Sequence, residues 1–101
     1  MIIVRDIFQV KFGKAKDAIA SWKKAAELIK RQDKKKRDLR ILTDLAGANY
    51  YTLIVESQFD SLAEFESMAA GMGSVKEMNA WYQEFIPLVE GGRREILNVV
   101  Q

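Results

Sequence analysis

The sequence predicts an α+β domain in which strands and helices follow one another in the order βαββαβ. Three observations carry this prediction. Segments rich in β-branched and aromatic residues lie near both ends of the chain and in its middle, where two of them flank a short turn. Segments with apolar residues at three- and four-residue steps separate these strands. The length of 101 residues suits a single domain, residues 1–101, with a modest core.

The chain begins with a predicted strand followed by a predicted helix. Residues 2–12 carry apolar side chains at both parities, which is typical of a strand that is buried on both faces. Gly13 is expected to end this strand. From Ala15 to Gln32 the apolar residues recur with a helical period, and lysines lie mainly on the opposite side. This segment predicts an amphipathic helix with an alanine-rich inner face.

The middle of the chain predicts a β-hairpin. Residues 38–45 and 50–57 have strand composition, and the short turn between them covers residues 46–49. Gly47 and Asn49 suit this turn because both residue types tolerate a positive φ. The second and third strands are therefore expected to be antiparallel neighbours.

Two helices are predicted after the hairpin. Residues 61–64, Ser-Leu-Ala-Glu, fit a capping box that opens the first helix, and residues 71–73, Gly-Met-Gly, are expected to interrupt it. A second capping box at residues 74–77 opens the next helix, whose apolar residues repeat at helical spacing. Pro87 should end this helix near Ile86.

The glycine pair at residues 91–92 predicts a turn before a last strand over residues 93–100. The complete order is that of the ferredoxin-like split βαβ arrangement, a four-stranded antiparallel sheet with helices on one face. The other face would meet water, yet the predicted strands carry apolar residues at both parities. We therefore expect a homodimer that forms through the open sheet face.

The composition excludes several function classes. Without cysteine there is no disulfide framework or thiolate nucleophile, and without histidine there is no imidazole base, His-dependent triad or usual haem ligand. No glycine cluster is followed by the Gly-Lys-Ser/Thr of a phosphate loop. We expect no metal site and no cofactor. No stretch approaches the ~18 apolar residues of a membrane span, so a cytoplasmic protein is expected.

A basic run is the most conspicuous charge feature. Lys34, Lys35, Lys36 and Arg37 could together bind an anion such as a phosphate group or an anionic lipid. The run also follows the end of the predicted first helix, where cations complement the helix dipole. No aromatic residues are interleaved with it to stack on bases. We favour a solvated helix end and do not expect nucleic acid as a partner.

Aromatic residues of the predicted helices and strands indicate a pocket. Trp22, Tyr51 and Trp81 would line a space between sheet and helices, with Asn98 as a polar anchor. Such a pocket would take a small apolar or aromatic ligand. The alternative interpretation is that both tryptophans fill the core at helical spacing.

The chain resembles the dimeric α+β barrel superfamily in its βαββαβ plan, in Lys11-Phe12-Gly13-Lys14 after the first strand and in Phe59-Asp60-Ser61-Leu62-Ala63-Glu64 after the third. The stretch from Asp60 to Glu64, followed by Trp81-Tyr82 and Phe85-Ile86-Pro87-Leu88, is most similar to the NIPSNAP-like branch. The superfamily includes cofactor-independent antibiotic-biosynthesis monooxygenases that act on aromatic polyketides.

Three hypotheses about function stay open at this point. The first is a homodimer that binds a small apolar ligand. The second, implied by the resemblance, is a cofactor-independent monooxygenase-like enzyme. The third is an interaction module that binds anions through the basic segment at residues 30–40.

Overall fold

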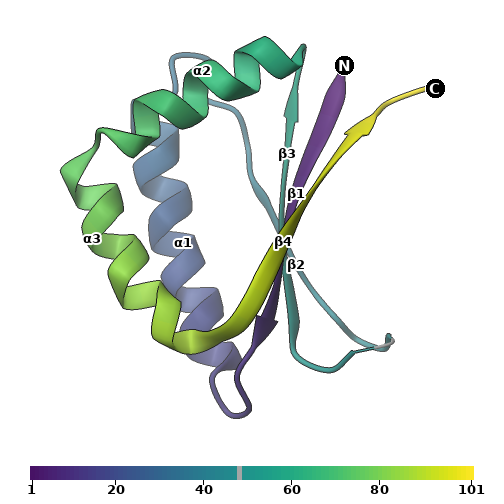
Figure 1. Cartoon of the computed structure of the whole chain (residues 1–101), viewed down its shortest axis with the longest axis vertical. Helices are drawn as coiled ribbons and strands as arrows, with labels where there is room; N and C mark the ends of the chain where they lie inside the picture. The colour runs from purple at the N-terminus through teal and green to yellow at the C-terminus, as the bar shows by residue number, and fades with distance from the viewer. Residues whose placement is uncertain (48) are drawn as a thin grey trace.

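The computed structural model describes residues 1–47 and 49–101, in which four strands form one antiparallel sheet in the order β2-β3-β1-β4. All three α-helices lie on one side of this sheet, and the other side is open (Figure 1). This is the predicted ferredoxin-like arrangement. None of the helices in the described residues is long and apolar enough to cross a bilayer. In chain order the elements are β1 (Ile2–Val10), α1 (Ala15–Gln32), β2 (Arg40–Thr43), β3 (Thr52–Phe59), α2 (Leu62–Gly73), α3 (Lys76–Phe85), the 3₁₀ helix η1 (Ile86–Leu88) and β4 (Val89–Asn98).

The two faces of the sheet follow from the alternation of side chains along β1. Val4 and Val10 are buried in apolar clusters on the helix side, and Phe8 packs against one of these clusters. Because successive side chains of a strand point to opposite faces, Arg5 and Ile7 lie on the open side. The pairing with β3 and β4 extends this division across the whole sheet.

Small residues let α1 lie close to the sheet. Ala18 and Ala25 are completely buried, and Trp22 lies between them on the same helix face. These side chains join Val10, Leu53 and Val55 of the sheet and Phe85 of α3 in the main apolar cluster. A second cluster under α2 holds Ile2, Val4, Phe59 and Phe65.

The predicted bounds of α1 and the predicted start of α2 are confirmed. The Ser61 hydroxyl accepts a hydrogen bond from the Glu64 backbone N–H at 3.2 Å, as an N-cap does. The second capping box is wrong. Val75 precedes α3 without any side-chain cap, and the Ser74 hydroxyl donates to the Gly71 carbonyl at 2.8 Å. The reason is that α2 continues through the predicted break, so that Ser74 ends α2 instead of opening α3.

The predicted turn at residues 91–92 is also wrong. Pro87 does end α3, but η1 already reverses the chain, and β4 begins directly after it at Val89. Both glycines therefore lie inside β4. Gly92 pairs with Phe8 of β1, and a Cβ at position 92 would lie only 2.7 Å from Cδ1 of the Phe8 ring. A glycine is needed here to make room for an aromatic ring, not to form a turn.

The β2–β3 connection is longer than predicted, because β2 has only four residues and β3 begins at Thr52. The predicted turn over residues 46–49 includes Ala48, which lies outside the described residues. In this connection Tyr51 has a positive φ of 59°, and Gly47 does not. The Asp44 carboxylate closes the connection by accepting a hydrogen bond from the Thr52 N–H at 2.6 Å.

Candidate functional site

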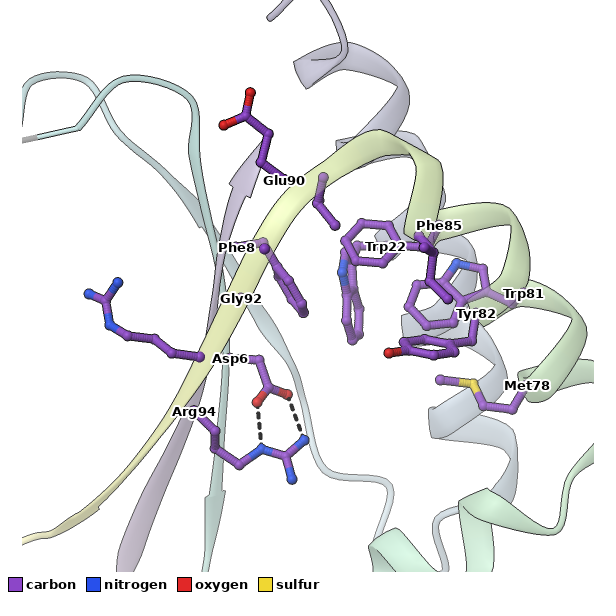
Figure 2. A pocket seen from close by; sticks show the side chains of 14 residues that line it. Asp6, Phe8, Trp22, Met78, Trp81, Tyr82, Phe85, Glu90, Gly92 and Arg94 are labelled. Atoms are coloured by element: carbon purple, nitrogen blue, oxygen red, sulfur yellow. Dashed lines mark hydrogen bonds and ion pairs between the residues drawn. The ribbon is translucent and has the colours of Figure 1, made fainter. Parts of the chain in front are cut away.

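A cavity of about 570 Å³ lies between the first half of β4, the strand β1 and the helices α1 and α3 (Figure 2). Its volume is within the range of roughly 300–1,000 Å³ that is typical of small-molecule sites. Five of its fourteen lining residues are aromatic. The aromatic side chains are Phe8 of β1, Trp22 of α1, and Trp81, Tyr82 and Phe85 of α3.

The aromatic rings of the cavity wall pack against one another. Trp81 and Phe85 are one helical turn apart on α3, and their rings stack with centroids 5.2 Å apart and an interplanar angle of 11°. Trp22 meets Trp81 edge-on at 4.7 Å, and Phe8 meets Phe85 edge-on at 4.9 Å. Such packed rings lose little further freedom when a flat molecule binds against them. The wall therefore suits a planar, largely apolar ligand.

The two indole N–H groups differ. Nε1 of Trp81 donates to the backbone carbonyl of Ser21 at 2.8 Å, which fixes this ring against α1. Nε1 of Trp22 is buried and has no hydrogen-bond partner among the described residues. A buried donor without a partner costs about 1–3 kcal/mol. Trp22 therefore offers the cavity the apolar surface of its ring, while its N–H is covered by the chain itself.

An ion pair forms the polar end of the cavity. Asp6 of β1 and Arg94 of β4 are direct cross-strand neighbours, and Arg94 Nε and Nη2 lie 2.6 and 3.3 Å from the two carboxylate oxygens (Figure 2). The hydrogen bonds to Asp6 raise the pKa of Arg94. The guanidinium also lies over the Phe65 ring, 5.1 Å from its centroid. Because a guanidinium has five N–H groups, Arg94 retains donors for an anionic or carbonyl oxygen of a ligand.

The structure brings together two of the four residues predicted for the pocket. Trp22 and Trp81 both line the cavity. Tyr51 instead lines a separate hollow beside Val10 and packs edge-on against Phe12 at 5.4 Å. Asn98 pairs with Ile2 at the far end of β4, six residues along the strand from the Phe8–Gly92 pair at the cavity. Asn98 lies away from the cavity because the cavity lies along the first half of β4, which includes residues 91–92 that were predicted to be a turn.

The sequence analysis missed Phe8, Tyr82 and Phe85 as wall residues and Asp6 and Arg94 as the ion pair. Phe8 has the same parity as Val4 and Val10, which is a signal that it faces the helices. The Asp6–Arg94 pair could be found only with the register of β1 and β4, which depends on where β4 begins.

The predicted anion-binding residues have partners within the chain. Lys35 Nζ lies 3.3 Å from the Asp60 carboxylate and 2.9 Å from that of Glu64. Arg37 bonds to the Asp33 carboxylate at 2.6 Å and also to Glu64. Hydrogen bonds from Lys35 and Arg37 lower the pKa of Glu64, and those to Glu64 and Asp60 raise the pKa of Lys35. This segment thus ties the end of α1 to the start of α2.

The remaining basic residues favour the same interpretation. Lys36 Nζ donates to the backbone carbonyls of Lys30 and Arg31, at 2.9 and 3.2 Å, and so satisfies the free carbonyls at the end of α1. Lys34 is exposed. These contacts are those of a solvated helix end, the interpretation that the sequence analysis favoured.

Within the described residues, no group of three His, Cys, Asp or Glu side chains is placed to hold a metal ion. The fold and the cavity together define a ferredoxin-like α+β protein with an aromatic-walled cavity under its helices and an uncovered sheet face. No family model matches the sequence, and no curated protein does either.

Comparison with solved structures gives the same fold. A NIPSNAP domain protein from Burkholderia xenovorans has a TM-score of 0.85 at 14% identity, over 99% of this chain and 95% of that one. A NIPSNAP family protein from Agrobacterium tumefaciens has a TM-score of 0.82 at 15% identity, over 98% and 86%. SnoaB, a cofactor-independent oxygenase from Streptomyces nogalater, has a TM-score of 0.73 at 11% identity, over 99% and 93%. The resemblance to NIPSNAP-like and monooxygenase-like proteins is confirmed at the level of the fold.

Proposed function

We propose that this protein is a homodimer that binds a small, flat, mostly apolar molecule in the cavity between β4, α1 and α3. The observation that carries the proposal is the cavity itself, about 570 Å³ in volume and lined by five aromatic side chains. A ring system of two or three fused rings fits such a wall by stacking. The Arg94 guanidinium favours a ligand that also carries an oxygen acceptor.

Intrinsic fluorescence is a direct test of ligand binding. Trp22 and Trp81 are the only two tryptophans of the sequence, and both line the cavity. Titration with naphthols, naphthoquinones and hydroxyanthraquinones should quench or shift the emission saturably, whereas N-acetyltryptophanamide in the same titrations should respond only linearly. A protein whose emission follows the free indole for every compound would contradict the proposal.

The homodimer is supported by the character of the open sheet face. Five aliphatic side chains lie on this face among charged residues. Aliphatic side chains on an uncovered sheet face are a feature of subunit interfaces. The five residues are Ile3, Ile7, Leu42, Ile54 and Leu97. We place this homodimer in the cytoplasm, as expected from the sequence.

A cofactor-independent oxygenase is the second candidate function. It is favoured by the similarity in fold to SnoaB together with an aromatic-walled cavity. Oxygen consumption in the presence of quinols and hydroxyaromatics, measured with an oxygen electrode and corrected for autoxidation, distinguishes an enzyme from a binding protein. Saturable binding without protein-dependent oxygen uptake would leave the binding function and remove the oxygenase.

A further inference from the structure

A second cavity, of about 190 Å³, lies under α2, next to the cavity described above. Asp6, Trp22, Met78 and Arg94 line both of them. In the view of Figure 2 the Asp6–Arg94 pair and Met78 lie at the end of the first cavity away from Glu90. The two spaces are therefore neighbours that share a wall. We refer to the first, with its five aromatic side chains, as the aromatic cavity.

The walls of the second cavity are apolar and flexible. Ten of its thirteen lining residues are apolar, and three of these are Met68 and Met72 of α2 and Met78 of α3. The whole sequence has four methionines. We therefore call this space the methionine hollow. Because a methionine side chain is unbranched and has three rotatable bonds, such a wall adjusts to the shape of a chain that enters it.

The volume of the methionine hollow suits an alkyl chain better than a second ring system. A cavity of roughly 150 Å³ takes up one benzene molecule, so the 190 Å³ of the hollow corresponds to about six to eight carbon atoms. A fused ring system of the size that fits the aromatic cavity is larger than this. An unbranched chain of about six carbons fills the hollow.

Arg94 provides a polar group at the shared wall. Its Nε and Nη2 donate to the Asp6 carboxylate, and one face of the guanidinium lies over the Phe65 ring. The remaining N–H groups of the guanidinium are suitable donors for an acceptor oxygen of a ligand. Since Arg94 lines both cavities, that oxygen lies where the ligand passes from one cavity to the other.

Met78 is the movable member of the shared wall. Trp22 packs edge-on against Trp81, with ring centroids 4.7 Å apart, and Asp6 and Arg94 hold each other by an ion pair. The Met78 side chain is half-buried and unbranched, so rotation about its bonds opens the wall without disturbing the rings. A chain attached to a ring in the aromatic cavity therefore has a way into the hollow.

We propose that the ligand is an aromatic ring compound with an oxygen substituent and, on the adjacent ring carbon, an unbranched alkyl chain of about six carbons. The ring lies in the aromatic cavity, the oxygen accepts a hydrogen bond from Arg94, and the chain lies in the methionine hollow. This inference rests on the proposed function and adds the second part of the ligand.

A series of 2-alkyl-1-naphthols, with chains from methyl to decyl, tests the inference by equilibrium dialysis against the original protein. Each methylene that enters the hollow should lower the dissociation constant by a factor of about two to four, so 2-hexyl-1-naphthol should bind at least about thirtyfold more tightly than 2-methyl-1-naphthol. The gain should level off near six to eight carbons, since longer chains leave the hollow. The isomer 4-hexyl-1-naphthol has the same composition, but its chain lies opposite the oxygen, and it should bind at least about tenfold more weakly than the 2-hexyl compound.

Two adjacent alanines of α2 provide matched variants. Ala69 lines the methionine hollow, whereas Ala70 is exposed. Ala69→Leu adds side-chain volume inside the hollow and should lower the ratio of the methyl to the hexyl dissociation constant to less than about fivefold, while Ala70→Leu should keep the ratio of the original protein. Ser57→Leu fills the same hollow from β3 and should act like Ala69→Leu, which provides a second variant if the first does not fold.

The outcomes separate the inference from the proposed function. A gain with chain length that Ala69→Leu or Ser57→Leu removes and Ala70→Leu keeps supports the inference. A ratio that is the same in every folded variant, or no gain in the original protein, overturns the inference and leaves the binding of ring compounds standing. Equal affinity for the two hexyl isomers overturns the placement of the oxygen at Arg94. If no naphthol binds at all, the inference and the proposed function are both wrong. Circular dichroism of each variant checks the fold.

Discussion

Replacement of Gly92 by alanine is expected to damage the cavity. A Cβ at this position would lie 2.7 Å from Cδ1 and 3.1 Å from Cε1 of Phe8, and 3.3 Å from the backbone oxygen of Ile7. Carbon atoms in good contact are about 3.5–4.0 Å apart, so the Phe8 ring has to move by about 0.8 Å or more. Its edge already packs on Phe85 at 4.9 Å, and it lies 5.8 Å from Trp22. The ring can therefore move only by disturbing the aromatic wall.

The expected magnitude follows from these contacts. Overpacking of a core costs about 1–3 kcal/mol, while a Gly→Ala change in a compatible backbone returns roughly 0.4–1 kcal/mol through the unfolded state. Gly91 provides a matched control in the same strand, because a Cβ there meets nothing within 4 Å. We expect Gly92→Ala to be about 2 kcal/mol less stable than Gly91→Ala.

Urea denaturation followed by far-UV circular dichroism gives this difference, and fluorescence titration gives the ligand affinity of both variants. Gly92→Ala should bind aromatic ligands at least tenfold more weakly than Gly91→Ala. If the two variants have the same urea midpoint and the same affinity, then Phe8 does not pack on Gly92 and the description of the cavity wall is wrong.

Three further predictions concern the contacts that position α1 and α2. Ser61→Ala should cost about 1 kcal/mol in urea denaturation, because it removes the N-cap of α2, and an unchanged midpoint would refute the cap. Arg37→Met should cost about 2 kcal/mol, since it leaves the buried Asp33 carboxylate without its cation, and a neutral result would mean that the pair is dispensable. Stability should fall on acidification below about pH 5, because hydrogen bonds from Lys35 and Arg37 hold the folded-state pKa of Glu64 below its ordinary value. This contribution is complete above the ordinary pKa and is lost as the pH falls through the lowered one. Glu64→Gln should therefore flatten the acid limb, and an acid limb as steep as that of the original protein would contradict the assignment.

The sequence predicted those parts of the fold that depend on local patterns. The helical spacing of apolar residues identified α1 with its correct bounds, and the Ser61 cap identified the start of α2. Pro87 ended α3 as predicted, because proline has no N–H for a helical hydrogen bond and its ring clashes with the preceding turn. Each of these three signals acts within a few residues of the chain and needs no distant partner.

The errors concern residues whose role depends on tertiary contacts. The Gly91-Gly92 pair is typical of a turn. Gly92 nevertheless lies inside β4, where it leaves room for the ring of Phe8, a residue 84 positions earlier in the chain. The same misplaced start of β4 hid the Asp6–Arg94 pair and made Asn98 look like a pocket residue. Trp22 and Trp81 were found because helical spacing directs both toward the sheet. Lys35 and Arg37 of the basic run pair with Glu64 of α2, which no local pattern connects to them.

The homodimer is the central claim, since the proposed covering of the open sheet face depends on it. Multi-angle light scattering of the protein at low micromolar concentration tests it most directly, with circular dichroism on the same sample to establish that the chain is folded. We predict a mass of twice the 11.5 kDa of one chain. A folded species with the mass of a single chain would contradict the account.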